Sequence, residues 1–115
     1  MKKRQIFDEI LNAAAEIFEL GPLEILSGSH RQEIVEARAV ALHYLMTAGL
    51  SAKDIIRFSE GSIRNAYSVT KSASTFYDRI ARSFALRCQN CRLSQAVEEI
   101  KQRAATKEKQ AENEQ

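Results

Sequence analysis

The apolar positions of this chain recur at the spacing of α-helices in several consecutive segments. Residues 5–20 place an apolar face opposite a polar one. Gly21-Pro22 ends this segment, because the residue before a proline avoids helical geometry. A single helical turn is expected over 23–26, followed by a loop over 27–29. The first quarter of the chain is therefore predicted to be helical with one sharp break.

A long helix and a short one are predicted next. The Ser-x-x-Gln pattern that starts at Ser29 is a capping box for the long helix, and Gly49 is expected to end it. A second capping box begins at Ser51 and opens a short helix that ends near Ser59. Glu60-Gly61 then turns the chain.

Three further helices are expected in the second half. Ser62 is predicted to cap a helix that runs to about Ala73, and a third capping box at Thr75 opens one that runs to about Cys88. A weaker helix is predicted from Leu93 to about residue 105, with its apolar residues in a narrow stripe.

The fold class follows from these segments. We find no convincing strand and no internal repeat, so the chain is predicted to be all-α, a compact helical bundle that contains a helix-turn-helix and has an extra C-terminal helix. We expect one domain over residues 1–104. Residues 105–115 are almost entirely charged or amide side chains and alanine, and this tail is expected to be frayed or disordered.

Composition narrows the classes of protein. The 115 residues suffice for one domain, and 44% hydrophobic with 28% charged residues is the balance of a globular protein. No apolar run approaches the roughly 18 residues of a membrane span, and no signal segment opens the chain. Two cysteines without a disulfide framework indicate a reducing compartment. We therefore expect a cytoplasmic protein with no membrane partner.

The charge is unevenly distributed. Residues 1–60 carry a net charge of −2, residues 61–92 carry +5, and residues 93–115 carry −1, for a total of +2. A basic segment between acidic ones is typical of a face that binds a polyanion, and it is equally compatible with a solvated helical surface.

Catalytic and metal chemistry find little support. Cys88 and Cys91 form a Cys-x-x-Cys pair, which is half of a tetrahedral zinc site or a redox couple. His30 and His43 lie far upstream in no ligand pattern, and no βαβ pattern supports a redox role. Two chains could pool four thiolates around one zinc ion; otherwise these are ordinary, partly buried thiols near a helix end. No glycine-rich phosphate loop is present. We expect no enzyme, catalytic residue, metal site, cofactor or small-molecule substrate.

The most informative unit is the helical pair over residues 50–73. A short helix, a turn with a glycine and a second helix with a basic, polar start form a helix-turn-helix pattern. Arg64 could bind guanine, Asn65 could pair with adenine, and Ile63 could contact a thymine methyl. Lys53, Arg57, Lys71 and the helix N-termini would anchor phosphates.

The run Leu26–Leu45 then resembles a known family. Its Glu33-Ile34-Val35-Glu36-Ala37-Arg38-Ala39-Val40-Ala41-Leu42-His43-Tyr44 is similar to the Arg-Glu-Ile-Val-Glu-Pro-Arg-Gln-Ile-Ala-Met-Tyr-Leu region in the C-terminal DNA-binding domain of the bacterial replication initiator DnaA. Ser51-Ala52-Lys53-Asp54-Ile55 matches the element that follows. The resemblance covers roughly residues 5–75. It implies a Trp-repressor-like fold, DNA binding and a stand-alone, divergent version of that domain.

This chain differs from the family at the positions that contact DNA in the family. The family's recognition helix reads close to Gly-Arg-Asp-His-Ser/Thr-Thr-Val, where this chain has Gly61-Ser62-Ile63-Arg64-Asn65-Ala66-Tyr67. The glutamine that follows the long-helix arginine is Ala39 here, and the basic loop is reduced to His30-Arg31. Arg38 alone carries over cleanly. A chain so altered is not expected to recognise the usual initiator site.

These observations predict double-stranded DNA binding through a helix-turn-helix, sequence-specific or guided by DNA structure, in a regulatory protein of a bacterium, phage or mobile element. The alternative is a protein–protein interaction module that keeps the scaffold and has lost DNA readout. A homodimer through the C-terminal helix is a further expectation. The predicted DNA-binding residues are His30, Arg31, Arg38, Lys53, Arg57, Ser62, Ile63, Arg64, Asn65, Ser68 and Lys71.

Overall fold

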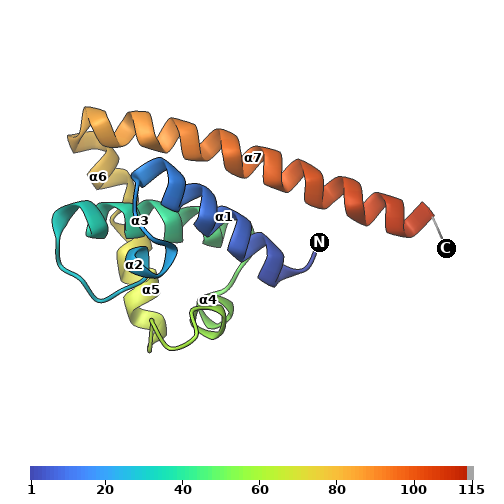
Figure 1. Ribbon diagram of the computed structural model, residues 1–115, viewed down its shortest axis with the longest axis horizontal. Helices are drawn as coiled ribbons and strands as arrows, with labels where there is room; N and C mark the ends of the chain where they lie inside the picture. Colours follow the sequence, from blue (N-terminus) through green and yellow to red (C-terminus); the bar gives the residue numbers. More distant parts are fainter. Residues whose placement is uncertain (114–115) are drawn as a thin grey trace.

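The computed structural model describes residues 1–113, and their side chains as far as residue 107 (Figure 1). The described chain is all-helical, with no strand, which confirms the predicted fold class. Its seven helices are α1 (Lys3–Phe18), α2 (Pro22–Ile25), α3 (Gln32–Thr47), α4 (Ala52–Phe58), α5 (Ala66–Ser74), α6 (Phe76–Arg82) and α7 (Phe84–Asn113).

Helices α1, α3 and α7 form the bundle that carries most of the core. α1 buries one face, which contains Phe7, Ile10 and Leu11, and it packs against both α3 and α7. α3 is buried on more than one side, since four consecutive residues, 39–42, are almost inaccessible to solvent. A helix that is apolar most of the way round belongs in the centre of a domain. In Figure 1 the remaining helices surround α3 and α1 on the sides that α7 leaves open.

The C-terminal region differs most from the sequence prediction. The helix predicted from Thr75 to about Cys88 breaks at Ser83, whose backbone is extended, so its first part is α6. Its last residues and the helix predicted from Leu93 form one continuous helix, α7, of 30 residues. No glycine or proline interrupts it, so nothing in its sequence stops a helix that is already docked. The apolar stripe of Leu93, Val97 and Ile100 is at most 3% exposed, in the same core cluster as the buried face of α1.

The end of α7 is also later than predicted. The helix expected to finish near residue 105 continues to Asn113, so residues 105–113 of the predicted frayed tail are helical, and 114–115 lie outside the described residues. Figure 1 shows these last turns extending beyond the other helices. The Arg103 guanidinium donates to Glu9 of α1 over 2.7 Å and so links the two helices.

Of the predicted helix caps, Gly49 and Ser51 are confirmed, Thr75 is the N-cap of α6 by position only, and Ser29 and Ser62 are wrong. Gly49 ends α3 with a φ of +103°, and Ser51 and Asp54 form the expected capping box of α4. Ser29 does not cap α3, which begins at Gln32 after Arg31. Neither Ser62 nor Thr75 caps a helix through its side chain. α3 and α6 begin without a side-chain cap, and α5 is capped by Asn65.

No described helix combines the length and the apolar character that crossing a lipid bilayer requires.

Candidate nucleic-acid interface

The start of α4 is fixed by a reciprocal pair of hydrogen bonds. The Asp54 amide donates to Ser51 Oγ over 3.1 Å, and the Ser51 amide donates to Asp54 Oδ2 over 3.0 Å. The Asp54 carboxylate also binds Lys3 and Arg57. The Ser51 amide, and then Lys3, hold the pKa of Asp54 below its usual value. Arg57 therefore already has an ion-pair partner within the protein.

The turn after α4 is built around a buried serine. Ser59 Oγ donates to the carbonyl of Ile56 over 2.7 Å and accepts the amide of Ile63 over 3.2 Å. Glu60 and Gly61 both have positive φ, 53° and 92°, and the second of these is a conformation that favours glycine. The Ile63 side chain is only 8% exposed and belongs to the core cluster.

The second helix of the unit starts later than predicted. Its N-cap is Asn65, whose Oδ1 accepts the Ser68 amide over 2.8 Å and the Ser68 hydroxyl over 3.0 Å. Ser62, Ile63 and Arg64 therefore precede the helix and lie in the turn. The prediction that Ser62 caps this helix is wrong, because the buried Ile63 draws the chain inward before the helix can begin.

This arrangement changes the roles available to the predicted base-contacting residues. The buried Ile63 cannot contact a thymine methyl in this conformation. Pairing of Asn65 with adenine requires both the oxygen and the nitrogen of its amide, and the oxygen is already occupied by the cap. Arg64 is exposed in the turn. Of the three predicted base-contacting residues, Arg64 alone is free to reach a groove in this conformation.

The exposed face of α5 adds a residue that sequence reasoning missed. Val69 is fully buried, and Tyr67 on the opposite side of the helix is 69% exposed. The Lys71 ammonium lies 5.6 Å from the centre of the Tyr67 ring. The signal was present in the sequence, since residues 67, 70, 71 and 74 share the helical face opposite Val69.

Arg38 braces a loop rather than projecting from α3. Its Nε donates to the carbonyl of Ile25 over 2.9 Å, and its Nη2 donates to the carbonyls of Ser27 and Ser29. Burial lowers the pKa of this guanidinium. Three carbonyls of residues 25–29 thus converge on one side chain, which fixes the loop that precedes His30 and Arg31. Both of these residues are exposed, and Arg31 pairs with Glu33.

A small cavity lies between this loop and the unit formed by α4, the turn that follows it and α5. It has a volume of about 250 Å³, smaller than the roughly 300–1,000 Å³ of pockets for drug-sized ligands. It lies between the loop, α3, the turn after α4 and α5. Five of the predicted DNA-binding residues line it: His30, Arg38, Ser62, Ile63 and Ser68.

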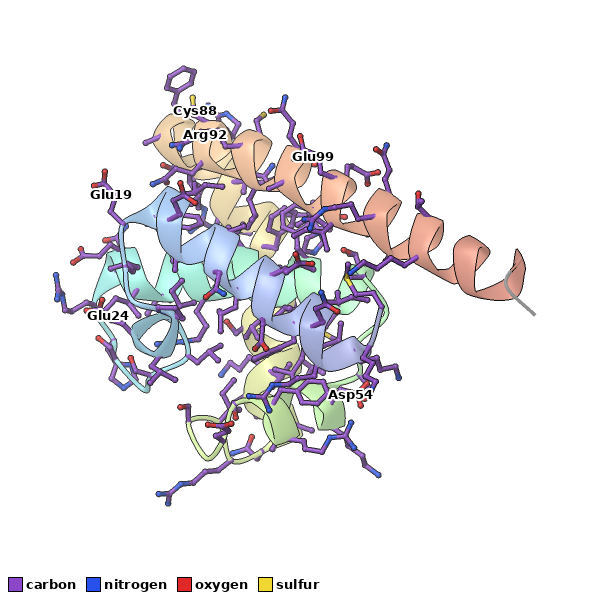
Figure 2. The ribbon with its side chains drawn as sticks, turned by 45° about the vertical axis from the view of Figure 1, so that its right-hand side comes forward. Glu19, Glu24, Asp54, Cys88, Arg92 and Glu99 are labelled. Atoms are coloured by element: carbon purple, nitrogen blue, oxygen red, sulfur yellow. The ribbon has the colours of Figure 1, made fainter. Side chains whose placement is uncertain are left out.

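We call the unit formed by the loop 26–31, α4, the turn 59–65 and α5 the α4–α5 corner. It lies on the opposite side of the bundle from α7 (Figure 1), and Figure 2 shows Asp54 of α4 far from Cys88 of α7. Lys53, Arg64 and Lys71 are exposed there and pair with no carboxylate among residues 1–107. The structure therefore gathers most of the predicted residues at one corner, where three cations are uncommitted.

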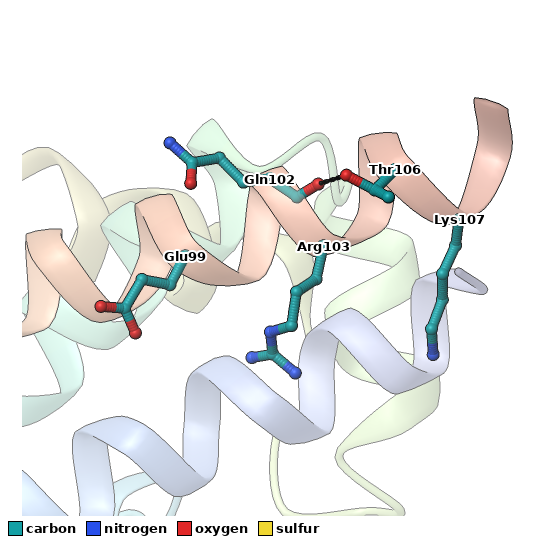
Figure 3. Close-up of a pocket in the computed structure, with 5 residues that line it drawn as sticks. All are labelled: Glu99, Gln102, Arg103, Thr106 and Lys107. Atoms are coloured by element: carbon teal, nitrogen blue, oxygen red, sulfur yellow. Dashed lines mark hydrogen bonds between the residues drawn. The ribbon is translucent and has the colours of Figure 1, made fainter. Parts of the chain in front are cut away.

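A second hollow lies on α7, and none of the predicted DNA-binding residues lines it. Its volume is about 600 Å³, and Glu99, Gln102, Arg103, Thr106 and Lys107 line it (Figure 3). All five come from α7, and the hydrogen bond within this group, from Thr106 Oγ1 to the Gln102 carbonyl, is internal to the helix. A hollow lined by one helix is a surface trough, so it adds no candidate site.

The described residues contain no group of three or more histidine, cysteine or acidic side chains placed to hold a metal ion. Comparisons with known protein families, with curated proteins and with solved structures find no match to this chain. The site must therefore be interpreted from its own geometry.

Proposed function

We propose that this protein binds double-stranded DNA through the α4–α5 corner and acts as a regulatory protein, without catalysing a reaction. The observation that carries the proposal is the set of three uncommitted cations, Lys53, Arg64 and Lys71, on a helix-turn-helix-like pair of helices. Cations that neutralise phosphates supply most of the affinity of proteins for duplex DNA. The resemblance to the initiator DNA-binding domain supports the same conclusion and suggests a bacterium, phage or mobile element as the source.

In this proposal α5 faces the major groove. Tyr67 and Lys71 are on its exposed side, and Arg64 projects from the turn that leads into it. Arg64 would contact base edges, since an arginine can bind the O6 and N7 of guanine together. Lys53 and Lys71 would contact phosphates, and Arg57 would join them by exchanging its contact with Asp54.

The loop would contribute through His30 and Arg31, with Arg38 in a supporting role. Because Arg38 donates to three loop carbonyls, it sets where His30 and Arg31 stand beside α5. This role differs from the direct DNA contact expected from the sequence. Asn65 and Ser68 would likewise act by fixing the first turn of α5.

A protein–protein interaction module is the second candidate. The inward position of Ile63 and the use of Asn65 as a cap remove two base contacts, while Tyr67 remains exposed as a large side chain suited to a protein interface. Salt dependence separates the two candidates, because phosphate contacts release counterions and a contact made by an aromatic side chain does not.

The test is duplex binding by the whole chain between about 50 and 200 mM salt. With Lys53, Arg57 and Lys71 on phosphates, we expect a log–log slope of roughly −2.7, from about −0.9 for each phosphate contact. Lys71→Ala should make the slope less steep by about 0.9. Lys107→Ala removes a cation from the far end of α7 and is the matched control.

Specificity is tested on a site selected from random duplexes. Arg64→Ala should cost about 1–3 kcal/mol on that site and leave binding to unrelated duplexes nearly unchanged. If no duplex is bound at 50 mM salt, or if the salt response is flat, DNA binding is excluded and the interaction module is favoured.

A further inference from the structure

The two cysteines are exposed side by side on one face of α7. Cys88 and Cys91 are both free and exposed, and neither is partly buried as the sequence suggested. At about 100° per residue, Phe84, Cys88 and Cys91 fall within a strip about 60° wide. The strip lies about 180° around the helix from Leu93 and Val97, which are buried against the bundle.

The strip therefore points directly away from the rest of the molecule. Phe84 is 73% exposed and extends the strip by one turn beyond Cys88. In Figure 2, Cys88 and Arg92 project from the outer end of α7, with no other helix in front of them. A second protein could approach the two thiols without displacing any part of this chain.

The spacing of the two thiols favours a bridging metal over a disulfide. Side chains three residues apart on a helix have Cβ atoms about 5–6 Å apart. A disulfide needs about 3.5–4.5 Å between its Cβ atoms, so it would distort the helix. Two thiolates on tetrahedral zinc, at about 2.3 Å from the metal, have sulfur atoms about 3.8 Å apart. Cysteine side chains reach that separation from an undistorted helix.

One chain supplies only half of such a site. No third donor of the metal-binding types joins the two thiols among the described residues. We propose that Cys88 and Cys91 are half of a tetrahedral zinc site, which the same pair from a second copy of this chain completes. The proposal concerns α7 and does not rest on DNA binding by the α4–α5 corner.

The arginines beside the strip favour a contact between two copies of the chain that forms only when the metal is bound. Arg87 and Arg92 flank the strip on its two sides and pair with no carboxylate among residues 1–107. Arg87 is held in place by donating to the carbonyls of Ile80 and Ala81, over 2.8 and 2.9 Å. These arginines give the strip a positive charge on both sides, so two copies of it repel each other without the metal. Zinc with four thiolates carries a net charge of −2, which the four arginines would offset.

The experiment measures mass and coordination in the full chain, with a non-thiol reductant present throughout. Adding Zn²⁺ should double the mass in sedimentation, with one zinc ion bound per two chains, and a chelator should reverse the change. Co²⁺ in place of zinc should give the thiolate-to-metal absorption of a four-sulfur tetrahedral site.

Cys88→Ser and Cys91→Ser should each abolish the zinc-dependent dimer, and Gln95→Ala, an exposed neighbour on the same face, should keep it. Circular dichroism checks that each variant is folded. A monomer that binds one zinc ion per chain would contradict the proposal that a second copy completes the site. The absence of zinc binding at micromolar metal would contradict the proposal that Cys88 and Cys91 bind zinc.

Discussion

The bundle of α1, α3 and α7 and the α4–α5 corner are held together by different forces. In the bundle, residues such as Ile10, Val40 and Leu93 are completely buried, and burial of apolar surface supplies the stability. In the corner, single polar side chains make the decisive contacts: Arg38 holds the loop, Ser59 holds the turn, and Asn65 starts α5. Four buried apolar side chains, Leu26, Ile55, Ile63 and Val69, attach the corner to the core.

The difference matters because the two kinds of contact fail differently. Loss of a buried apolar side chain leaves a cavity that weakens the whole domain. Loss of one directional hydrogen bond releases the segment that it held, and the rest of the fold can persist. We therefore expect substitutions in the bundle to change global stability, and substitutions in the corner to change local structure and ligand binding first.

The largest effect is expected from a substitution in the bundle. Leu93→Ala should lower the free energy of unfolding by about 2–5 kcal/mol, because Leu93 is fully buried in the core cluster that α7 shares with α1 and α3. Urea denaturation followed by circular dichroism measures the change. Leu23→Ala is the control, since Leu23 is 69% exposed and its loss should change stability by less than about 0.5 kcal/mol. Equal effects of the two substitutions would contradict the assignment of α7 to the core.

A smaller and more local loss of stability is expected from substitution of Arg38, which holds the loop over residues 25–29. Arg38→Met keeps the aliphatic stem and removes the donors to three carbonyls, so stability should fall by about 1–3 kcal/mol. Hydrogen exchange should accelerate over residues 25–31 far more than in α1 or α7. Arg38→Lys should recover part of the protection, because an ammonium can serve fewer of the carbonyls at once. Acceleration spread evenly over the bundle would mean that Arg38 is not a local brace.

The helix cap tests the corner at a single position. Asn65→Ala should lower stability by about 1 kcal/mol, because the amide of Ser68 loses its acceptor. Asn65→Asp keeps the acceptor and should be nearly neutral. Ser62→Ala should also be neutral if Asn65 is the cap. Thermal melts of the three variants measure these differences. A larger loss of stability from Ser62→Ala than from Asn65→Ala would show that Ser62, as predicted from the sequence, caps the helix.

The smallest effect is expected at His43, whose contribution to stability depends on pH. His43 stacks on Phe76 with 3.7 Å between ring centres; burial lowers the pKa of its imidazole, and Lys101 lowers it further. The unfolded state then binds this proton more tightly, so the contribution of neutral His43 is complete above about pH 6.5 and is lost as pH falls below that value. The neighbouring Tyr44 and Tyr77 are uncharged throughout this range.

We expect His43→Phe to lose less stability than the parent protein between pH 7 and pH 5. Denaturation at each pH measures the difference. Asp54, whose pKa is also lowered, loses its contribution only below about pH 4, so it does not interfere. An identical pH dependence in both proteins would show that folding leaves the pKa of His43 unchanged.

The same contrast explains what the sequence could predict. The buried faces of α1 and α3 follow from apolar spacing, and so does the stripe of Leu93, Val97 and Ile100, because periodicity records burial directly. The start of α5 did not follow, because Ser62 and Asn65 are both good caps and only the burial of Ile63 decides between them. Arg38 was identified as important, but its partners are backbone carbonyls of residues 25–29. Carbonyls are identical in every residue and leave no signal in a sequence.

The pairing of the first and last long helices has a consequence for how the chain is made. α1 packs against α7, and Glu9 binds Arg103, so these contacts join helices that are far apart in the sequence. A ribosome adds about 5–20 residues per second, so α1 waits roughly 5–20 s for its partner after it has been synthesised. During this time its apolar face is only partly covered by α3. Nascent chains that stop before α7 should therefore be the ones that chaperones hold and proteases remove.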